Sequence, residues 1–269
     1  MIEQDGTSAG DYVYAGALRT YYEVRGTGEP VVMLHGGFCT IETWEAQTPA
    51  LAERYRVVLP ERRAHGRTPD LEGSITFANM AQDTIAFMDA IGLSRAHLVG
   101  WSDGGNVGLE VALARPDLVG KLVMMSAAAN LDGMTPEMPA ELEDLATDTL
   151  PPMLRDPYEA LSPDGPEHLG IVVGKLKQLW STEPNHVLQD LEGVSIPTLV
   201  MVADDDFVTV EHAAAMQRAI PDAQLAVVPG TDHALLFEKP ELVNRLILDF
   251  LAEEQTPKLF TEGHGEGND

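Results

Sequence analysis

The chain has 269 residues, a formal net charge of −26 and one cysteine. This length fits one large domain with an insertion better than two equal domains. Its 43 Asp and Glu residues outnumber 17 Lys and Arg residues, so nucleic acid and anionic membrane surfaces are excluded as expected partners. No apolar run is long enough to span a membrane, the N-terminus lacks the pattern of a secretory signal, and a lone cysteine forms no internal disulfide, so we expect a cytoplasmic protein. We interpret the acidic excess as a charged surface that keeps the protein soluble, which includes adaptation to high salt. We favour this interpretation over an acidic patch that recruits cationic substrates.

Apolar segments of strand type alternate with helical patterns along most of the chain. Residues 11–26 predict an antiparallel hairpin. Strands are expected at 30–36, 55–61, 95–102, 121–127, 197–206 and 224–230, and helices at 41–53, 75–92, 106–116, 210–220 and 240–254. Such alternation with short links predicts an α/β fold, whose mostly parallel sheet has helices on both faces.

The alternation stops between residues 130 and 190, where prolines, methionines and short helical pieces replace the strands. We therefore expect core residues 1–129 and 191–254 to be interrupted by a helical insertion at 130–190 over the carboxyl edge of the sheet. Residues 255–269 are polar and Gly-rich, which predicts a disordered acidic tail.

The sequence GWSDG places Gly100, Ser102 and Gly104 where an expected strand passes into an expected helix. A G-x-S-x-G pattern in that context is typical of a nucleophile elbow, a sharp turn that exposes the serine hydroxyl. Small residues are needed on both sides because the turn leaves little room. The helix that follows directs its free N–H groups toward the reacting centre. A glycine-rich turn with an incidental serine is the alternative.

A nucleophilic serine needs a base and a carboxylate that orients the base. His233 is the best-placed histidine, because it follows the last expected strand and its loop lies at the carboxyl edge. Asp206 is our choice for the acid. Asp205 is the second choice, and Asp132 is a less favoured alternative after an earlier strand. Asp204 is interpreted as a solvated or capping charge.

Backbone amides are expected to bind the oxyanion that forms during acyl transfer. The LHGGF segment after the first parallel strand offers Gly37, or alternatively Phe38, and the elbow offers the amide of Asp103. Substrate contacts are expected from Phe38, Trp101 and Asp103. His35 is expected to brace the glycine loop, and Cys39 to be a small apolar filler.

The order Ser102, Asp206, His233, with HGGF and ERRAHGRTPD upstream, resembles the α/β-hydrolase superfamily from about Tyr12 to Glu254. The resemblance implies an eight-stranded, mostly parallel sheet with a cap inserted after the sixth strand. The elbow GWSDGG is similar to that of the biphenyl-hydrolase-like group. In that group the residue matching Asp103 is thought to receive the α-amino group of amino-acid esters. Three modest departures from the superfamily pattern are Glu61, Ala64 and Ala203.

These residues together predict a serine hydrolase that cleaves carboxylic esters of small molecules through an acyl-enzyme, with no metal or organic cofactor. A carboxylate nucleophile, as in the haloalkane dehalogenases and epoxide hydrolases of this fold, is disfavoured by Ser102. Lactonase, thioesterase, carbon–carbon hydrolase and perhydrolase activities use the same triad and stay open. A non-catalytic small-molecule receptor is the alternative of a different class.

Overall fold

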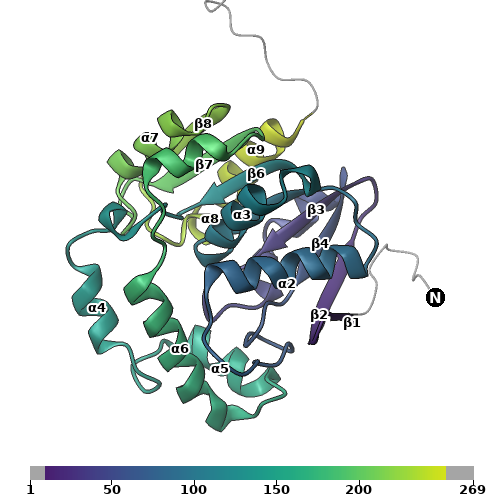
Figure 1. The fold of residues 1–269 in the computed structure, drawn as a ribbon, viewed down its shortest axis with the longest axis vertical. Coiled ribbons are helices and arrows are strands. Elements are labelled where there is room, and N and C mark those ends of the chain that lie inside the picture. Colours follow the sequence, from purple (N-terminus) through teal and green to yellow (C-terminus); the bar gives the residue numbers. More distant parts are fainter. Residues whose placement is uncertain (1–9, 253–269) are drawn as a thin grey trace, which may run out of the picture.

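The computed structural model describes residues 10–252 and contains one eight-stranded sheet in the order β1-β2-β4-β3-β5-β6-β7-β8 (Figure 1). Only β1 with β2 and β2 with β4 pair in antiparallel fashion, and the other neighbours are parallel. This architecture confirms the predicted mostly parallel α/β fold. The strands are β1 (Asp11–Ala15), β2 (Leu18–Arg25), β3 (Glu29–Leu34), β4 (Tyr55–Pro60), β5 (Ala96–Trp101), β6 (Val119–Met125), β7 (Thr198–Ala203) and β8 (Ala223–Val228).

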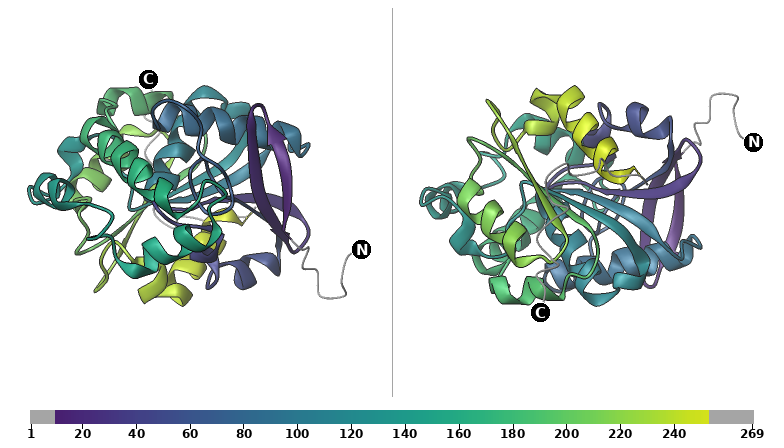
Figure 2. Two further views of the ribbon diagram at one scale, coloured as in Figure 1. Left: turned by 90° about the horizontal axis from the view of Figure 1, so that it is seen from below. Right: turned by 90° about the horizontal axis from the view of Figure 1, so that it is seen from above.

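Helices pack on both faces of the sheet (Figure 2). The α-helices are α1 (Thr48–Ala52), α2 (Phe77–Ala90), α3 (Asp103–Ala114), α4 (Met138–Asp144), α5 (Pro152–Leu161), α6 (Leu169–Thr182), α7 (Val210–Ala219), α8 (Leu235–Glu238) and α9 (Pro240–Leu251). Short 3-10 helices occupy η1 (Ile41–Trp44), η2 (Pro116–Leu118), η3 (Leu131–Gly133), η4 (Pro166–His168) and η5 (Leu188–Gly193).

The central strands are mostly apolar because both of their faces are covered. In β3, Val32 and Leu34 join the core beneath α2, α3 and α7, while Val31 and Met33 join the core beneath α1 and α9. Successive side chains of a strand point to opposite faces, so one continuous apolar run supplies two cores.

Helix α2 shows how local sequence sets the limits of an element. The Thr76 hydroxyl accepts a hydrogen bond from the Asn79 amide, and the Asn79 side chain accepts one from the Thr76 amide, each at 3.0 Å. This capping box satisfies N–H groups that a helix start leaves free. Gly92 follows the helix with φ +71°, a conformation that glycine adopts at low cost.

The helix predicted over residues 41–53 is wrong in its extent. The structure divides this region into η1 and the five-residue α1, with Pro49 in the first turn of α1. Proline has no N–H to continue a preceding helix, so it favours a new start. Trp44 and Leu51 are nevertheless fully buried in the core under α9.

Residues 130–190 lie between β6 and β7 and contain α4, α5 and α6, which group at one end of the sheet in Figure 1. Contacts with the loop after β4 hold this segment in place. The Asp70 carboxylate accepts hydrogen bonds from Lys175 Nζ at 2.6 Å and His168 Nε2 at 2.8 Å. The tail predicted to be disordered at 255–269 lies outside the described residues.

Candidate active site

Ser102 lies at the sharp turn between β5 and α3 with φ +56°, in the left-handed region that non-glycine residues seldom adopt. The flanking glycines have no room for a side chain. A Cβ on Gly100 would lie 2.1 Å from the carbonyl oxygen of Gly104, and a Cβ on Gly104 would lie 1.8 Å from the carbonyl oxygen of Leu34. The glycine spacing is therefore a steric requirement of this turn.

The structure brings Asp206 and His233 together at the ends of β7 and β8. Asp206 Oδ1 lies 2.9 Å from His233 Nδ1, and the Asp206 side chain is fully buried. Burial acts to raise the pKa of Asp206, but hydrogen bonds from His233 and from the Ser126 hydroxyl to Oδ2 outweigh it and lower the pKa. An ionised carboxylate only accepts hydrogen bonds, so His233 Nδ1 is the donor in this contact and Nε2 is the second ring nitrogen.

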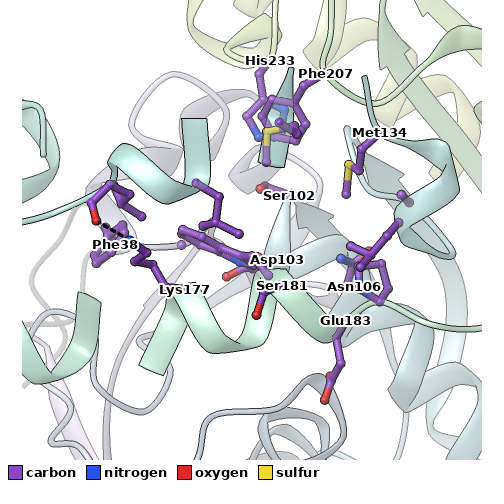
Figure 3. Close-up of a pocket in the computed structure, with 18 of the residues that line it drawn as sticks. Phe38, Ser102, Asp103, Asn106, Met134, Lys177, Ser181, Glu183, Phe207 and His233 are labelled. Carbon is purple, nitrogen blue, oxygen red and sulfur yellow. Dashed lines mark hydrogen bonds between the residues drawn. The ribbon is translucent and has the colours of Figure 1, made fainter. Parts of the chain in front are cut away.

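His233 contacts two aromatic side chains. Phe207 stacks on the imidazole with ring centroids 3.9 Å apart, and Trp101 Nε1 donates a hydrogen bond to the His233 carbonyl at 2.9 Å. In Figure 3, Ser102 lies near the stacked rings of His233 and Phe207, and all three face the same pocket. No hydrogen bond joins Ser102 to His233 among the described residues, and such contacts often tighten only when substrate binds.

Two amides near Ser102 have the placement expected of oxyanion donors. Asp103 is the first residue of α3, where helix geometry leaves the N–H without an intrahelical partner. Gly37 lines the pocket beside Ser102 and Asp103. Within residues 10–252, neither amide has a hydrogen-bond acceptor. Phe38, the alternative donor, has φ +57° and also lines the pocket.

The Asp103 side chain is 3% exposed and faces the 130–190 segment. Its Oδ1 accepts a hydrogen bond from Trp180 Nε1 of α6 at 2.8 Å, while Oδ2 has no partner in the described part of the chain. Burial raises the pKa of Asp103, and the Arg62 charge and the Trp180 hydrogen bond offset this only in part. Asp103 thus connects the elbow with the helical segment above it.

A cavity of about 940 Å³ opens beside Ser102 and His233, and more than half of its lining residues come from the 130–190 segment. Met134, Met138 and Trp180 of this segment all line it. A second cavity of about 640 Å³ shares Phe38, Phe207 and His233 with the first and does not include Ser102. Met153, 74% exposed, lines this second cavity.

The other acidic candidates lie away from the imidazole of His233. Asp204 accepts a hydrogen bond from the Thr231 amide, which ties its loop to the next one. Asp205 is exposed, and Asp132 is an exposed residue of η3 whose charge acts on His212. The sequence interpretation missed Ser126, Phe207 and Arg62. For Ser126 one signal was available, because a polar residue directly after a buried parallel strand faces the carboxyl edge.

Comparisons with known proteins identify the family. A family model described as "Alpha/beta hydrolase family" matches residues 31–246. The chain belongs to the alpha/beta hydrolase family. It is 27% identical to "Putative carbamate hydrolase RutD" of Azorhizobium caulinodans, covering 90% of this chain and 98% of that protein. It is 30% identical to the 2-hydroxy-6-oxo-6-phenylhexa-2,4-dienoate hydrolase of Burkholderia cepacia, covering 87% and 92%.

A solved structure agrees with the fold of this alpha/beta hydrolase. The meta-cleavage product hydrolase CumD of Pseudomonas fluorescens IP01 has a TM-score of 0.78 at 24% identity, covering 90% of this chain and 97% of that chain. The described residues of our hydrolase contain no group of three or more His, Cys, Asp or Glu side chains that could hold a metal ion. Within residues 10–252, no helix has the length and apolarity needed to cross a membrane.

Proposed function

We propose that this hydrolase cleaves carboxylic esters that carry an apolar acyl group, with Ser102 as nucleophile, His233 as base and Asp206 as the acid that orients the base. One observation carries the proposal. Ser102 projects from a strained turn into the same cavity as His233, whose other ring nitrogen is bound to a buried carboxylate. Nucleophilic catalysis requires a nucleophile beside a base that a third group orients, and strained backbone is common at such sites.

The reaction follows from this geometry. Ser102 Oγ attacks the ester carbonyl carbon while His233 Nε2 takes the hydroxyl proton, and the amides of Gly37 and Asp103 bind the oxyanion. The tetrahedral intermediate collapses, the bond to the alcohol oxygen breaks, and His233 returns the proton to that oxygen. Water then attacks the acyl-enzyme with the same proton transfers, which releases the carboxylic acid and restores Ser102.

The two cavities suggest where each half of the ester binds. The larger cavity contains Ser102 and Gly37 together with apolar side chains such as Leu145 and Leu150, which suits an acyl chain. The smaller cavity contacts His233 without Ser102, so it suits the departing alcohol that His233 protonates. Residues 130–190, which supply most of the larger lining, act in this proposal as a cap that selects the acyl group.

The charges around the larger cavity favour neutral or cationic substrates over anions. Its lining includes the acidic residues Asp103, Glu143 and Glu183, and Lys177 is the only Lys or Arg of the described lining. Lys177 Nζ already donates to the carbonyl oxygens of Glu143 and Leu145, at 2.8 and 3.1 Å. A dienoate anion, as in the name of the Burkholderia cepacia relative, would meet three acidic residues there and one lysine, whose ammonium group already donates to two backbone carbonyls.

Amino-acid esters are a second candidate substrate class. Asp103 Oδ2 is buried, lacks a partner and belongs to the lining of the larger cavity. An ammonium group would satisfy this oxygen with a charge-assisted hydrogen bond. The same contact would offset the repulsion between the Asp103 carboxylate and the oxyanion that develops beside it.

A substrate panel tests the proposal. Purified wild-type protein and Ser102→Ala are assayed on p-nitrophenyl acetate, hexanoate and decanoate, on a lactone, on a carbamate ester and on a 2-hydroxy-6-oxo-dienoate. We expect Ser102-dependent hydrolysis of the esters, with hexanoate or decanoate cleaved faster than acetate. Absence of ester hydrolysis, or equal rates for both proteins, would contradict the proposal.

A further inference from the structure

Arg62 is a buried arginine outside the proposed triad. It follows β4, is 4% exposed, and no carboxylate oxygen within residues 10–252 contacts it. Burial of an unpaired cation is costly unless its N–H groups find acceptors. Arg62 Nη2 donates to the carbonyl oxygens of His35 and Gly36, at 2.6 and 2.9 Å. Both acceptors belong to the glycine loop that carries Gly37.

His35 supports the same carbonyl group. Its Nε2 accepts a hydrogen bond from the Arg62 amide at 3.1 Å, so a neutral ring carries its proton on Nδ1, which donates to Gly36 O at 2.8 Å. Burial, reinforced by the Arg62 charge, holds the pKa of His35 well below its usual value and keeps the ring neutral. The Cys39 amide is a third donor to Gly36 O, at 3.3 Å.

These donors fix the direction of the Gly37 amide. The Gly36–Gly37 peptide is trans, so the N–H of Gly37 points opposite to the carbonyl of Gly36. The carbonyl is turned to the buried Arg62, while Gly37 borders the cavity. A Gly-Gly link has a wide choice of backbone conformations. Without its donors the peptide could turn over and present a carbonyl oxygen to the oxyanion.

We propose that Arg62 is a positioning residue that holds the Gly36–Gly37 peptide so that the Gly37 N–H faces the cavity as an oxyanion donor. The inference rests on the proposed function and extends it to a residue that does not line the cavity. The Arg62 charge has a second effect, because it acts on the buried Asp103 and offsets that carboxylate beside the oxyanion.

Arg63 provides a matched control. It is the next residue, it is similarly buried at 8% exposure, and its guanidinium pairs with Asp83 of α2, with Nη2 2.8 Å from Oδ1. None of its hydrogen bonds within the described residues involves the glycine loop. Replacing either arginine removes a buried cation, but of the two only Arg62 donates a hydrogen bond to the Gly36 carbonyl.

The test compares Arg62→Met and Arg62→Lys with Arg63→Met and Arg63→Lys on p-nitrophenyl hexanoate. Loss of an oxyanion donor costs about 10²- to 10³-fold in kcat, so we expect a fall of that order for Arg62→Met, with KM changed by less than about threefold. Arg62→Lys keeps the charge but not the planar pair of donors, so we expect a fall of about tenfold or more. The Arg63 variants should keep kcat within about threefold of wild type while losing thermal stability.

Two further readouts separate positioning from general distortion. Affinity for a trifluoromethyl ketone, which forms a tetrahedral adduct, should fall with kcat/KM, whereas affinity for the hexanoate product should not. Labelling of Ser102 by a fluorophosphonate, which also needs the oxyanion site, should slow in both Arg62 variants. If Arg62→Lys, the milder change, matches Arg63→Lys in kcat and labelling rate, or ketone and product affinities fall equally, the inference is overturned while the proposed function stands. If wild-type Ser102 is neither labelled nor active, both fail.

Discussion

The carboxyl edge of the sheet and the helical segment 130–190 form opposite walls of one cavity, yet they are built differently. Ser102, Asp206 and His233 stand at the ends of β5, β7 and β8, where strand pairing and sterically required glycines leave little freedom. The segment 130–190 supplies mainly apolar surface and no member of the proposed triad. In the proposed reaction, the chemistry therefore depends on backbone geometry at the sheet edge, whereas substrate choice depends on side-chain packing.

Changes at the sheet edge should have the largest effects. Ser102→Ala and His233→Ala should each lower kcat by about 10⁴-fold or more on every ester, because the triad acts as a unit. Asp206→Asn should cost a comparable or somewhat smaller factor, since it disturbs the tautomer of His233. Steady-state kinetics provide the measurement, and circular dichroism confirms that the variants fold.

Asp205→Asn is the control for this prediction, because it removes a neighbouring but exposed carboxylate. It should leave kcat within about threefold of wild type. A large loss of kcat in Asp205→Asn, together with a nearly wild-type kcat in Asp206→Asn, would show that the acid is wrongly assigned.

Asp103 contacts both regions, so the effect of its replacement on activity should depend on the substrate. Asp103→Asn keeps the side-chain volume and an oxygen for Trp180 but removes the charge. We expect kcat/KM for amino-acid esters to fall about 10- to 100-fold, the equivalent of one charge-assisted hydrogen bond. Neutral esters of the same size should be spared or cleaved faster.

Trp180→Phe is the matched variant, because it removes the donor to Asp103 Oδ1 and keeps an aromatic ring. It should preserve the preference for amino-acid esters. Equal losses on both ester classes in Asp103→Asn would instead assign Asp103 a structural role as the acceptor for Trp180.

Changes within 130–190 should redistribute substrate preference without stopping the reaction. Leu145→Trp fills part of the larger cavity, so kcat/KM for p-nitrophenyl decanoate should fall about tenfold or more while the value for acetate changes by less than about threefold. Ile171→Trp, on the exposed side of α6 at 54% exposure, is the control and should change neither. A uniform loss for all chain lengths in Leu145→Trp would contradict the assigned acyl site.

The smallest effect should come from surface charge, which belongs to neither region. If the net charge of −26 reflects salt adaptation, NaCl should raise the melting temperature, because the Debye length falls to about 3 Å at 1 M. Relief of 1 kcal/mol of repulsion corresponds to about 2–4 °C for a chain of this size. Thermal melts from 0.05 to 2 M NaCl measure it, and a flat curve would remove the idea.

The fold was predictable from the sequence because its strands are long apolar runs that end in glycine or polar turns. The positions of the candidate residues at the sheet edge were predictable for the same reason, since a residue that directly follows a predicted strand must lie at that edge. Asp206 lies against His233, and the contact of Ser126 as a further hydrogen-bond donor to Asp206 depends on β6 lying beside β7.

Other features depend on contacts between residues far apart in sequence. The Arg62 contact with the glycine loop spans 26 positions and the Trp180 contact with Asp103 spans 77, so no local pattern reports either. Pro49 indicated from the sequence that the helix predicted at 41–53 is divided, but nothing local indicated the burial of Trp44 and Leu51. The helices of 130–190 carry scattered apolar residues, and which of these line the cavity is known only once the orientation of the helices is known.

Covalent trapping is the most direct test of whether Ser102 is an activated nucleophile. Wild-type protein, Ser102→Ala and His233→Ala are incubated with a fluorophosphonate and followed by intact-protein mass spectrometry with peptide mapping. We expect stoichiometric labelling of wild type on the peptide that contains Ser102, much slower labelling of His233→Ala, and none of Ser102→Ala. Labelling that persists in Ser102→Ala, or an unlabelled wild type, would contradict this expectation.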